Sequence, residues 1–260
     1  MEIIIRDKNT AGIPLLEVFL ADRAAELPIL FLVHEFSASK ETYLKLGYQF
    51  AKQGYFVVTF DAHLHGELET PEFRKLNFTA KLEKLFELWT GTSQYISTLV
   101  RYYKKQPPTR IRRIGLIGVS MGGFAIFHYL SQQSKDKVDV AICLNSSPSW
   151  LNIFKMMNRE HPGMDRHFTE EFLRIVMQIQ PSNCLEHFGA VPILILNGEK
   201  DDKISLDDLL AAVEGLKTVY PNKSHVKSIV YKGVGHKVIP PMLHESEKWL
   251  KRFLLDTSSS

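Results

Sequence analysis

The sequence predicts an α/β protein built on a mostly parallel sheet with helices on both faces. Short, continuous apolar runs of strand length alternate with segments in which apolar residues recur at helical spacing. Strands without polar alternation are buried on both faces, which is typical of parallel sheets covered by helices. The 260 residues, 45% of them hydrophobic, are sufficient for one large core.

The first two strands are predicted to form a hairpin, which places antiparallel strands at one edge of the sheet. Glu2–Arg6 and Leu15–Leu20 are rich in β-forming residues, and residues 9–14 between them carry turn formers. Six apolar runs of strand length follow. They are Ile29–Val33, Phe56–Phe60, Ile114–Ile117, Val140–Leu144, Ile193–Leu196 and Val226–Val230.

Helices are predicted between these strands from the spacing of apolar residues and from N-cap signals. They cover Thr42–Lys52, the region around Ile96–Tyr103, the segment after Ser120, the segment after the N-cap Ser205, and Met242–Phe253.

Two further regions are predicted to cover the site. Residues 147–190 are much longer than a usual connection between strands, so we predict a helical insertion, or lid, in a core made of residues 1–146 and 191–260. Phe154, Met157 and Phe172 in this insertion are candidates for lining a substrate pocket, or equally for the buried face of a helix. The region Glu67–Trp89 is a candidate for a second cover.

Composition argues against several classes of protein. The net charge of +3 is nearly balanced and no long block of Lys and Arg occurs, so no nucleic-acid partner is expected. The two cysteines form neither a disulfide framework nor a zinc spacing. The N-terminus does not look like a signal peptide, and no apolar stretch approaches the length of a membrane span. We therefore expect a cytoplasmic protein, and a homodimer remains open.

The most informative motif is Gly118-Val119-Ser120-Met121-Gly122, a G-x-S-x-G pattern between a predicted strand and a predicted helix. A nucleophilic serine must stand on a sharp, strained turn, and small neighbours are required where strand and helix approach closely. The N-terminus of the helix also favours developing negative charge. An inert serine in a tight turn is the alternative interpretation.

A reactive serine needs a base, and the base needs an acid that orients it. Among ten histidines, His236 stands out because it lies in a glycine-rich loop directly after the last predicted strand. Asp201 and Asp202 lie in the loop after the strand Ile193–Leu196. The chain order is then Ser, Asp, His, as expected for an α/β-hydrolase arrangement.

On these residues the sequence resembles α/β-hydrolases, in particular small bacterial serine esterases of the dienelactone-hydrolase and prolyl-oligopeptidase-like branch. The resemblance covers nearly the whole chain apart from residues 147–190. The family pattern G-x-x-D-x-x-[VI]-[PS] matches residues 198–205, and this match selects Asp201. The resemblance implies an eight-stranded sheet that begins with the hairpin. Dienelactone hydrolases themselves have a cysteine where this chain has Ser120.

An oxyanion hole is also required, and its first donor is expected to be the backbone N–H of Met121. The family usually has His-Gly-Phe after the third strand, where this chain has His34-Glu35-Phe36, so the resemblance implies the N–H of Phe36 as second donor. Glutamate adopts the unusual backbone angles of glycine only at a cost. We expect the Glu35 side chain to point away from the oxyanion, either as a solvated surface group or at the pocket mouth, selecting a cationic or hydrogen-bonding substrate.

No metal and no organic cofactor are expected. His63-Leu64-His65 has a spacing seen in metallohydrolases, but the Asp-His pair that usually follows is missing, and two histidines are too few ligands for zinc.

The sequence thus predicts a serine hydrolase that cleaves a small-molecule carboxylic ester, with Ser120, His236 and Asp201 as catalytic residues. The same residues would also support amide or peptide hydrolysis or acyl transfer. A non-catalytic binding protein on the same fold is a weaker alternative.

Overall fold

The computed structural model describes residues 2–23, 27–105, 113–132, 138–161 and 164–255. In these segments one eight-stranded sheet has the order β1-β2-β4-β3-β5-β6-β7-β8. β1 and β2 pair antiparallel, as do β2 and β4, and all other neighbours are parallel. The predicted fold class is therefore confirmed. The strands are β1 (Ile3–Thr10), β2 (Ile13–Leu20), β3 (Ile29–Val33), β4 (Phe56–Phe60), β5 (Ile114–Val119), β6 (Val140–Leu144), β7 (Ile193–Gly198) and β8 (Val226–Tyr231).

The N-terminal hairpin is longer and its turn shorter than the sequence predicts. β1 continues to Thr10, and only Ala11 (φ 54°) and Gly12 (φ 82°) separate it from β2. Two successive residues with positive φ form a tight turn whose twist matches that of the flanking strands. The polar end of β1 lacks a strand signal of its own, and it is held by pairing with β2, which is buried throughout.

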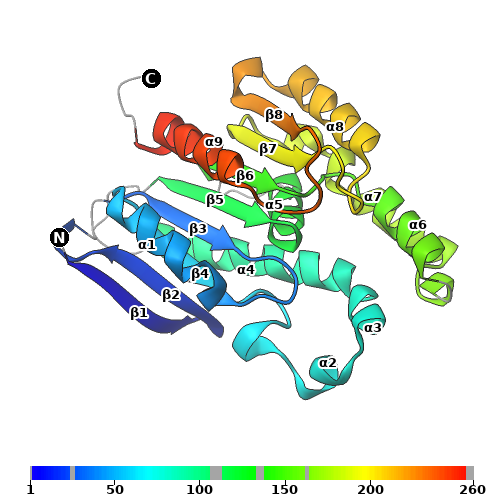
Figure 1. Cartoon of the computed structure of the whole chain (residues 1–260), viewed down its shortest axis with the longest axis horizontal. Coiled ribbons are helices and arrows are strands. Elements are labelled where there is room, and N and C mark those ends of the chain that lie inside the picture. Colours follow the sequence, from blue (N-terminus) through cyan, green and yellow to red (C-terminus); the bar gives the residue numbers. More distant parts are fainter. Residues whose placement is uncertain (1, 24–26, 106–112, 133–137, 162–163, 256–260) are drawn as a thin grey trace.

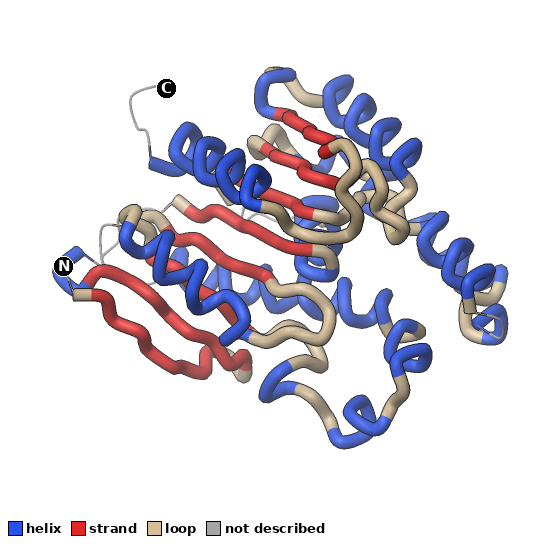
Figure 2. The backbone as a smooth tube through the Cα atoms, in the orientation of Figure 1, coloured by secondary structure: helices blue, strands red, loops and turns tan. Residues whose placement is uncertain are grey.

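Helices cover both faces of the sheet (Figures 1 and 2). α1 (Leu44–Lys52) and α9 (Pro240–Leu250) pack on one face, and a short 3-10 turn over Lys40–Tyr43 replaces the predicted start of α1. The opposite face is covered by α4 (Leu85–Lys105), α5 (Met121–Ser131) and α8 (Leu206–Val219). The predicted helix around Ile96–Tyr103 is the second half of α4.

Four short helices lie beyond the carboxyl ends of the parallel strands (Figure 1). α2 (Pro71–Lys75) and α3 (Phe78–Leu82) follow β4, whereas α6 (Leu151–Glu160) and α7 (Glu170–Ile179) follow β6. The chain after α3 contacts the chain at α7: the rings of Phe86 in α4 and Phe172 in α7 lie 5.5 Å apart, and Nε2 of His167, which precedes α7, lies 3.2 Å from a carboxylate oxygen of Glu83, which follows α3. Both regions predicted as covers therefore stand on the same side of the sheet.

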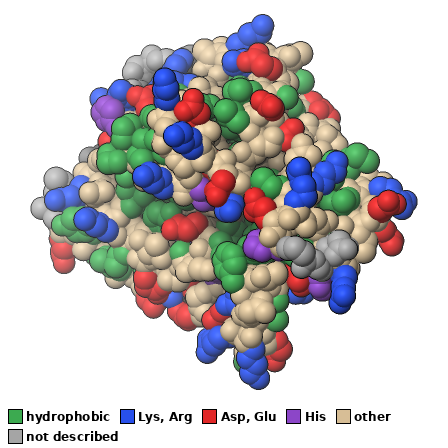
Figure 3. All heavy atoms as spheres, turned by 45° about the vertical axis from the view of Figure 1, so that its right-hand side comes forward, with side chains coloured by type: hydrophobic (Ala, Val, Ile, Leu, Met, Phe, Trp, Pro, Cys, Tyr) green, Lys and Arg blue, Asp and Glu red, His purple; other side chains and the backbone are tan. Residues whose placement is uncertain are grey.

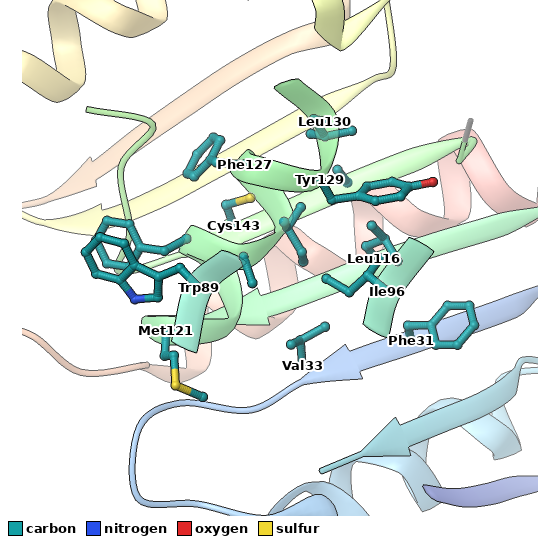
Figure 4. Packing of buried hydrophobic residues seen from close by; sticks show 14 of the residues in the cluster. Phe31, Val33, Trp89, Ile96, Leu116, Met121, Phe127, Tyr129, Leu130 and Cys143 are labelled. Carbon is teal, nitrogen blue, oxygen red and sulfur yellow. The ribbon is translucent and has the colours of Figure 1, made fainter. Parts of the chain in front are cut away.

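The core between the sheet and the helices α4 and α5 extends to the carboxyl ends of the parallel strands. Trp89 of α4 is 1% exposed and stacks on Phe124 of α5 at 4.4 Å between ring centroids. Figure 4 shows Trp89 and Met121 at one end of this packed layer. Fully burying a side chain of this size contributes on the order of 2 kcal/mol. The start of α5 is therefore held rigidly by the core.

Candidate active site

Ser120 stands on a strained turn between β5 and α5. Its backbone has φ 49° and ψ −113°, in a region that residues with a side chain rarely adopt. The Ser120 N–H donates to the carbonyl of Leu144 at 2.8 Å, and its own carbonyl accepts from Phe124 N–H at 3.0 Å. These two bonds and the packed helix hold the strained conformation, which presents the hydroxyl above the strand ends.

Two glycines of the G-x-S-x-G motif are required by close approach of backbone to backbone. A Cβ atom on Gly118 would lie 2.5 Å from the carbonyl carbon of Gly122. A Cβ atom on Gly122 would lie 2.2 Å from the carbonyl oxygen of Val33 in β3. Real Cβ atoms do not approach backbone atoms so closely, so strand and helix could not meet here with larger residues.

His236, in the loop between β8 and α9, lies between Ser120 and Asp201. Its Nε2 is 2.9 Å from Ser120 Oγ, and its Nδ1 is 2.8 Å from Asp201 Oδ2. The carboxylate can only accept, so Nδ1 carries the proton in the neutral ring and Nε2 accepts from the serine hydroxyl. This is the hydrogen-bond pattern of a serine nucleophile, a general base and an orienting acid.

The structure brings Asp201, and not Asp202, to His236. The Asp201 side chain is only 1% exposed, and its second oxygen accepts from Lys203 N–H at 2.9 Å. The Asp202 side chain is 72% exposed and lies 3.5 Å from Lys203 Nζ. Both oxygens of Asp201 are thus directed by hydrogen bonds, whereas Asp202 points into solvent.

The backbone N–H groups of Met121 and Phe36, the two predicted oxyanion donors, lie on elements that meet beside Ser120. Both residues line the same cavity as Ser120. Within the described residues neither N–H donates to an acceptor of the protein. Met121 is the first residue of α5, where helical N–H groups have no intrahelical partner. Both groups are therefore available to a ligand oxygen.

His34 ties the loop after β3 to the loop after β4. Its Nδ1–H donates to the carbonyl of Glu35 at 2.8 Å, and its Nε2 accepts from the N–H of Ala62 at 3.0 Å. The side chain is completely buried, and burial lowers the pKa of His34 below its ordinary value. The ring is neutral at pH 7 and holds the backbone next to Phe36 in one position.

Glu35 does not carry the expected backbone cost, and of the two side-chain placements left open it takes the one at the pocket. The positive φ in this loop falls on Ser37 (φ 62°) and not on Glu35, so the glutamate replaces glycine without backbone strain. The side chain is not a solvated surface group, because Glu35 is half-buried, lines the cavity and accepts a hydrogen bond from the Tyr43 hydroxyl. Burial and the neighbouring carboxylate raise the pKa of Tyr43, which keeps the phenol protonated and able to donate.

A cavity of about 550 Å³ opens beside Ser120, His236 and Glu35, and its walls are mainly apolar. Figure 3 shows this side of the molecule, with acidic, basic and histidine side chains around apolar ones. The apolar wall consists of Phe36, Phe78, Leu82, Leu85, Trp89, Val119, Met121, Phe124, Ile153, Met156, Met157 and Val238. Such a volume is within the range of small-molecule sites.

The predicted pocket residues divide into wall and support. Met157 and Glu35 line the cavity, but Phe154 and Phe172 do not, so their predicted pocket role is corrected. Phe154 is 0% exposed and packs on Trp89 at 5.5 Å and on Phe172 at 5.2 Å. These two phenylalanines lie behind the wall because the face of α6 and α7 that carries them is turned toward the core.

Sequence reasoning missed Asn145 and Tyr43. Asn145 follows β6 with φ 49°, is 1% exposed and lines the cavity next to Ser120. A polar residue directly after a buried strand was the available signal, because the carboxyl ends of parallel strands meet at this edge. Tyr43 carries no such signal, since its contact with Glu35 depends on the turn between β3 and α1.

His63 and His65 engage neighbours within the protein. His63 Nδ1 is 3.2 Å from the Tyr95 hydroxyl and its Nε2 is 3.5 Å from Glu87, whereas His65 Nδ1 donates to the carbonyl of His63 at 2.9 Å. Burial lowers the pKa of His65 to about 4. In the described residues no three His, Cys, Asp or Glu side chains gather as a metal site. Nor does any described helix combine the length and hydropathy that crossing a bilayer requires.

The serine stands at a strand–turn–helix elbow and contacts a histidine, and the histidine contacts a buried carboxylate. On a sheet of this kind, these features define the class of α/β-hydrolases. Residues 25–159 match the family described as serine aminopeptidase, S33, and residues 93–254 match the family described as BAAT / acyl-CoA thioester hydrolase C terminal. The chain belongs to these families of the α/β-hydrolase superfamily, and it is a hydrolase of ester-type bonds.

Individual relatives agree with this assignment. The chain is 22% identical to "Putative esterase YitV" of Bacillus subtilis, over 97% of this chain and 100% of the relative. The crystal structure of TT1662 from Thermus thermophilus matches with a TM-score of 0.77 and 20% identity, over 98% of this chain and all of that one. The esterase Pf2001 of Pyrococcus furiosus matches with a TM-score of 0.67 and 19% identity, over 97% and 93% of the two chains. At these identities the two structural matches support the fold alone.

Proposed function

We propose that the chain hydrolyses small carboxylic esters through an acyl-enzyme formed on Ser120. The observation that carries the proposal is the continuous chain of contacts from Ser120 Oγ to His236 at 2.9 Å and from His236 to Asp201 at 2.8 Å. A serine hydroxyl is a weak nucleophile at neutral pH and becomes reactive when a positioned base accepts its proton.

In the first half of the reaction, Ser120 Oγ attacks the ester carbonyl while His236 Nε2 takes the serine proton. Asp201 holds the protonated Nδ1 and stabilises the imidazolium that forms. The N–H groups of Met121 and Phe36 bind the oxyanion of the tetrahedral intermediate. The carbon–oxygen bond to the alcohol then breaks, and His236 gives its proton to the leaving alcohol.

In the second half, water replaces the alcohol. His236 takes a proton from the water molecule, which attacks the acyl carbon, and the same oxyanion donors bind the second intermediate. The bond to Ser120 breaks, the serine recovers its proton from His236, and the carboxylic acid leaves. These steps use groups of the chain, the substrate and one water molecule.

The cavity supports an apolar group on the substrate. Phe36, Trp89 and Met157 are among the side chains that would pack against an acyl chain. We propose that residues 147–190 act as the cover of this site, because α6 supplies Ile153, Met156 and Met157 to the cavity wall. The division into a core of residues 1–146 and 191–260 with a helical lid is part of the same proposal.

The test is covalent labelling combined with kinetics. A fluorophosphonate should label the wild-type chain and the control Ser39→Ala, whose serine contacts Glu41 at the start of the Lys40–Tyr43 turn, but not Ser120→Ala. Hydrolysis of a p-nitrophenyl ester should fall by at least about 10³-fold in Ser120→Ala. Equal labelling of Ser120→Ala and wild type would contradict the proposal.

Amide hydrolysis is the second candidate, because one matched family is described as serine aminopeptidase. The same three residues are able to cleave either bond. Matched ester and amide substrates with the same acyl group separate the two activities. A higher kcat/KM for the amide would show that amides, and not esters, are the substrate class. Tight binding of both compounds without turnover would indicate a binding protein.

A further inference from the structure

Glu35 is a negatively charged group in an otherwise mainly apolar cavity. It is half-buried and lines the cavity together with Ser120 and His236. Its carboxylate accepts a hydrogen bond from Tyr43, which is a neutral donor. Among the described residues, no Lys, Arg or His nitrogen lies within ion-pair distance of this carboxylate.

The other carboxylate on the cavity wall, that of Glu160, has a cationic neighbour. Glu160 lies 3.8 Å from Lys203 Nζ, and its side chain is 41% exposed. Lys203 also lies 3.5 Å from Asp202, so Glu160 already has a cationic neighbour, which it shares with a second carboxylate. A partly buried charge is costly unless it is paired. Glu35 therefore has the larger capacity to gain from a cation that a ligand brings.

The location of Glu35 determines where on the ligand that cation would lie. Consecutive Cα atoms are about 3.8 Å apart, so Glu35 adjoins Phe36, the residue whose N–H is the proposed second oxyanion donor. Hydrogen bonds from His34 Nδ1 at 2.8 Å and from Ala38 N–H at 3.3 Å hold the Glu35 carbonyl, and Tyr43 holds its side chain. The charge is thus fixed on the wall of the cavity that Ser120, Phe36 and Met121 also line.

We infer that Glu35 is a specificity-determining residue for esters whose acyl group carries a protonated amine close to the scissile carbonyl. The ammonium group pairs with the Glu35 carboxylate, and the apolar part of the acyl group packs in the cavity. Tyr43 is a positioning residue that acts through Glu35. This inference rests on the proposed function, since it names the substrate class of the same site.

The test compares leucine methyl ester with methyl 4-methylpentanoate, which has the same carbon chain without the amine. At pH 7 the wild-type ratio of kcat/KM for the amino ester over the neutral ester should be at least about tenfold. Glu35→Gln removes the negative charge that pairs with the ammonium group, so it should lower this ratio about tenfold or more. The matched control Glu160→Gln should retain the wild-type ratio.

The variant Tyr43→Phe tests whether Tyr43 positions the Glu35 carboxylate or only supports the local structure. It should raise KM for the amino ester and lower the ratio, with a smaller change in kcat for either ester. A wild-type preference for the neutral ester, or an unchanged ratio in Glu35→Gln, would overturn the inference. An equal loss in Glu160→Gln would assign the effect to the general charge of the cavity and would overturn it as well.

A binding measurement distinguishes this inference from the proposed function. Calorimetric titration of leucine methyl ester into Ser120→Ala and into Ser120→Ala/Glu35→Gln requires no turnover. A tenfold weaker Kd in the double variant supports the role of Glu35 even if neither ester is hydrolysed, whereas equal affinity overturns it. Hydrolysis that depends on Ser120 but shows no preference for the amine leaves the proposed function standing alone.

Discussion

Asp201 and His236 are 35 residues apart in the chain, yet Asp201 Oδ2 lies 2.8 Å from His236 Nδ1. The two loops meet because β7 and β8 are parallel neighbours that end together, with Gly198 opposite Tyr231. Two backbone bonds then join the loops, from Glu199 N–H to the Tyr231 carbonyl at 2.9 Å and from Lys200 N–H to the Val234 carbonyl at 2.8 Å. The pair is therefore preorganised by the edge of the sheet.

The first prediction concerns this pair. Asp201→Asn should lower kcat for a p-nitrophenyl ester by about 10³- to 10⁴-fold, because an amide cannot stabilise the imidazolium and favours the wrong tautomer. Asp202→Asn, which changes an exposed neighbour, is the matched control and should retain most of the activity. Steady-state kinetics with both variants decide this, and a larger loss in Asp202→Asn would reverse the assignment.

The second prediction concerns the backbone contact under Ser120. Gly122→Ala should lower both activity and stability, because its Cβ would lie 2.2 Å from the Val33 carbonyl oxygen and the elbow would have to move. Gly47→Ala in α1 is the control, since its nearest contact would be an ordinary 3.5 Å. There we expect a gain of roughly 0.5–1 kcal/mol from helix propensity. Chemical denaturation measures both changes, and an intact, fully active Gly122→Ala would refute the argument.

The third prediction separates the cavity wall from its support. Met157→Ala should shift the preference toward longer acyl chains in a series of p-nitrophenyl esters, because Met157 lines the cavity. Phe154→Ala should instead destabilise the fold by about 3–5 kcal/mol, because this ring is completely buried in an aromatic cluster. Thermal unfolding and the chain-length profile are the two measurements. A changed profile without loss of stability in Phe154→Ala would place that ring on the wall.

The fourth prediction concerns acid sensitivity. Burial lowers the pKa of His65 from 6.5 to about 4, so the unfolded chain binds the proton more readily than the folded chain between these pH values. The stability contributed by neutral His65 is complete above pH 6.5 and is lost as the pH falls toward 4. The full shift corresponds to roughly 3 kcal/mol.

Urea unfolding of the wild type and His65→Gln between pH 7 and 4.5 checks this expectation. The variant should start from a lower free energy of unfolding but lose less of it on acidification. His244→Gln is the control, because the His244 side chain is 65% exposed. Parallel pH curves for the wild type and His65→Gln would contradict the prediction.

The fold was predictable because its signals are local. Each parallel strand is an apolar run such as Ile29–Val33, and the spacing of buried side chains is set within one element. Discrepancies arise where pairing or packing overrides local preference. β1 extends to Thr10 through pairing with β2, and α4 joins two segments that have separate helical patterns. A cytoplasmic location and a homodimer stay predictions.

The site was predictable in its chemistry but not in its surroundings. Ser120, Asp201 and His236 each lie in the turn or loop that follows a strand, and parallel strands end at one edge of the sheet, so the order of motifs implies their proximity. The sequence around Phe154 and Phe172 is equally compatible with an acyl pocket and with the buried face of a helix. Only the direction in which α6 and α7 turn shows that neither ring lines the cavity.

The sequence by itself determined the strand and helix pattern and the strained serine turn, because these depend on side-chain volume and backbone preference within a few residues. The tertiary structure brings Asp201 to His236, as the family pattern implied, and only the tertiary structure decided that Glu35 pairs with Tyr43 at the cavity wall. Such choices depend on which way a side chain points and how deeply it is buried. Those properties are set by elements that are distant in the chain and meet only when the sheet and its helices assemble.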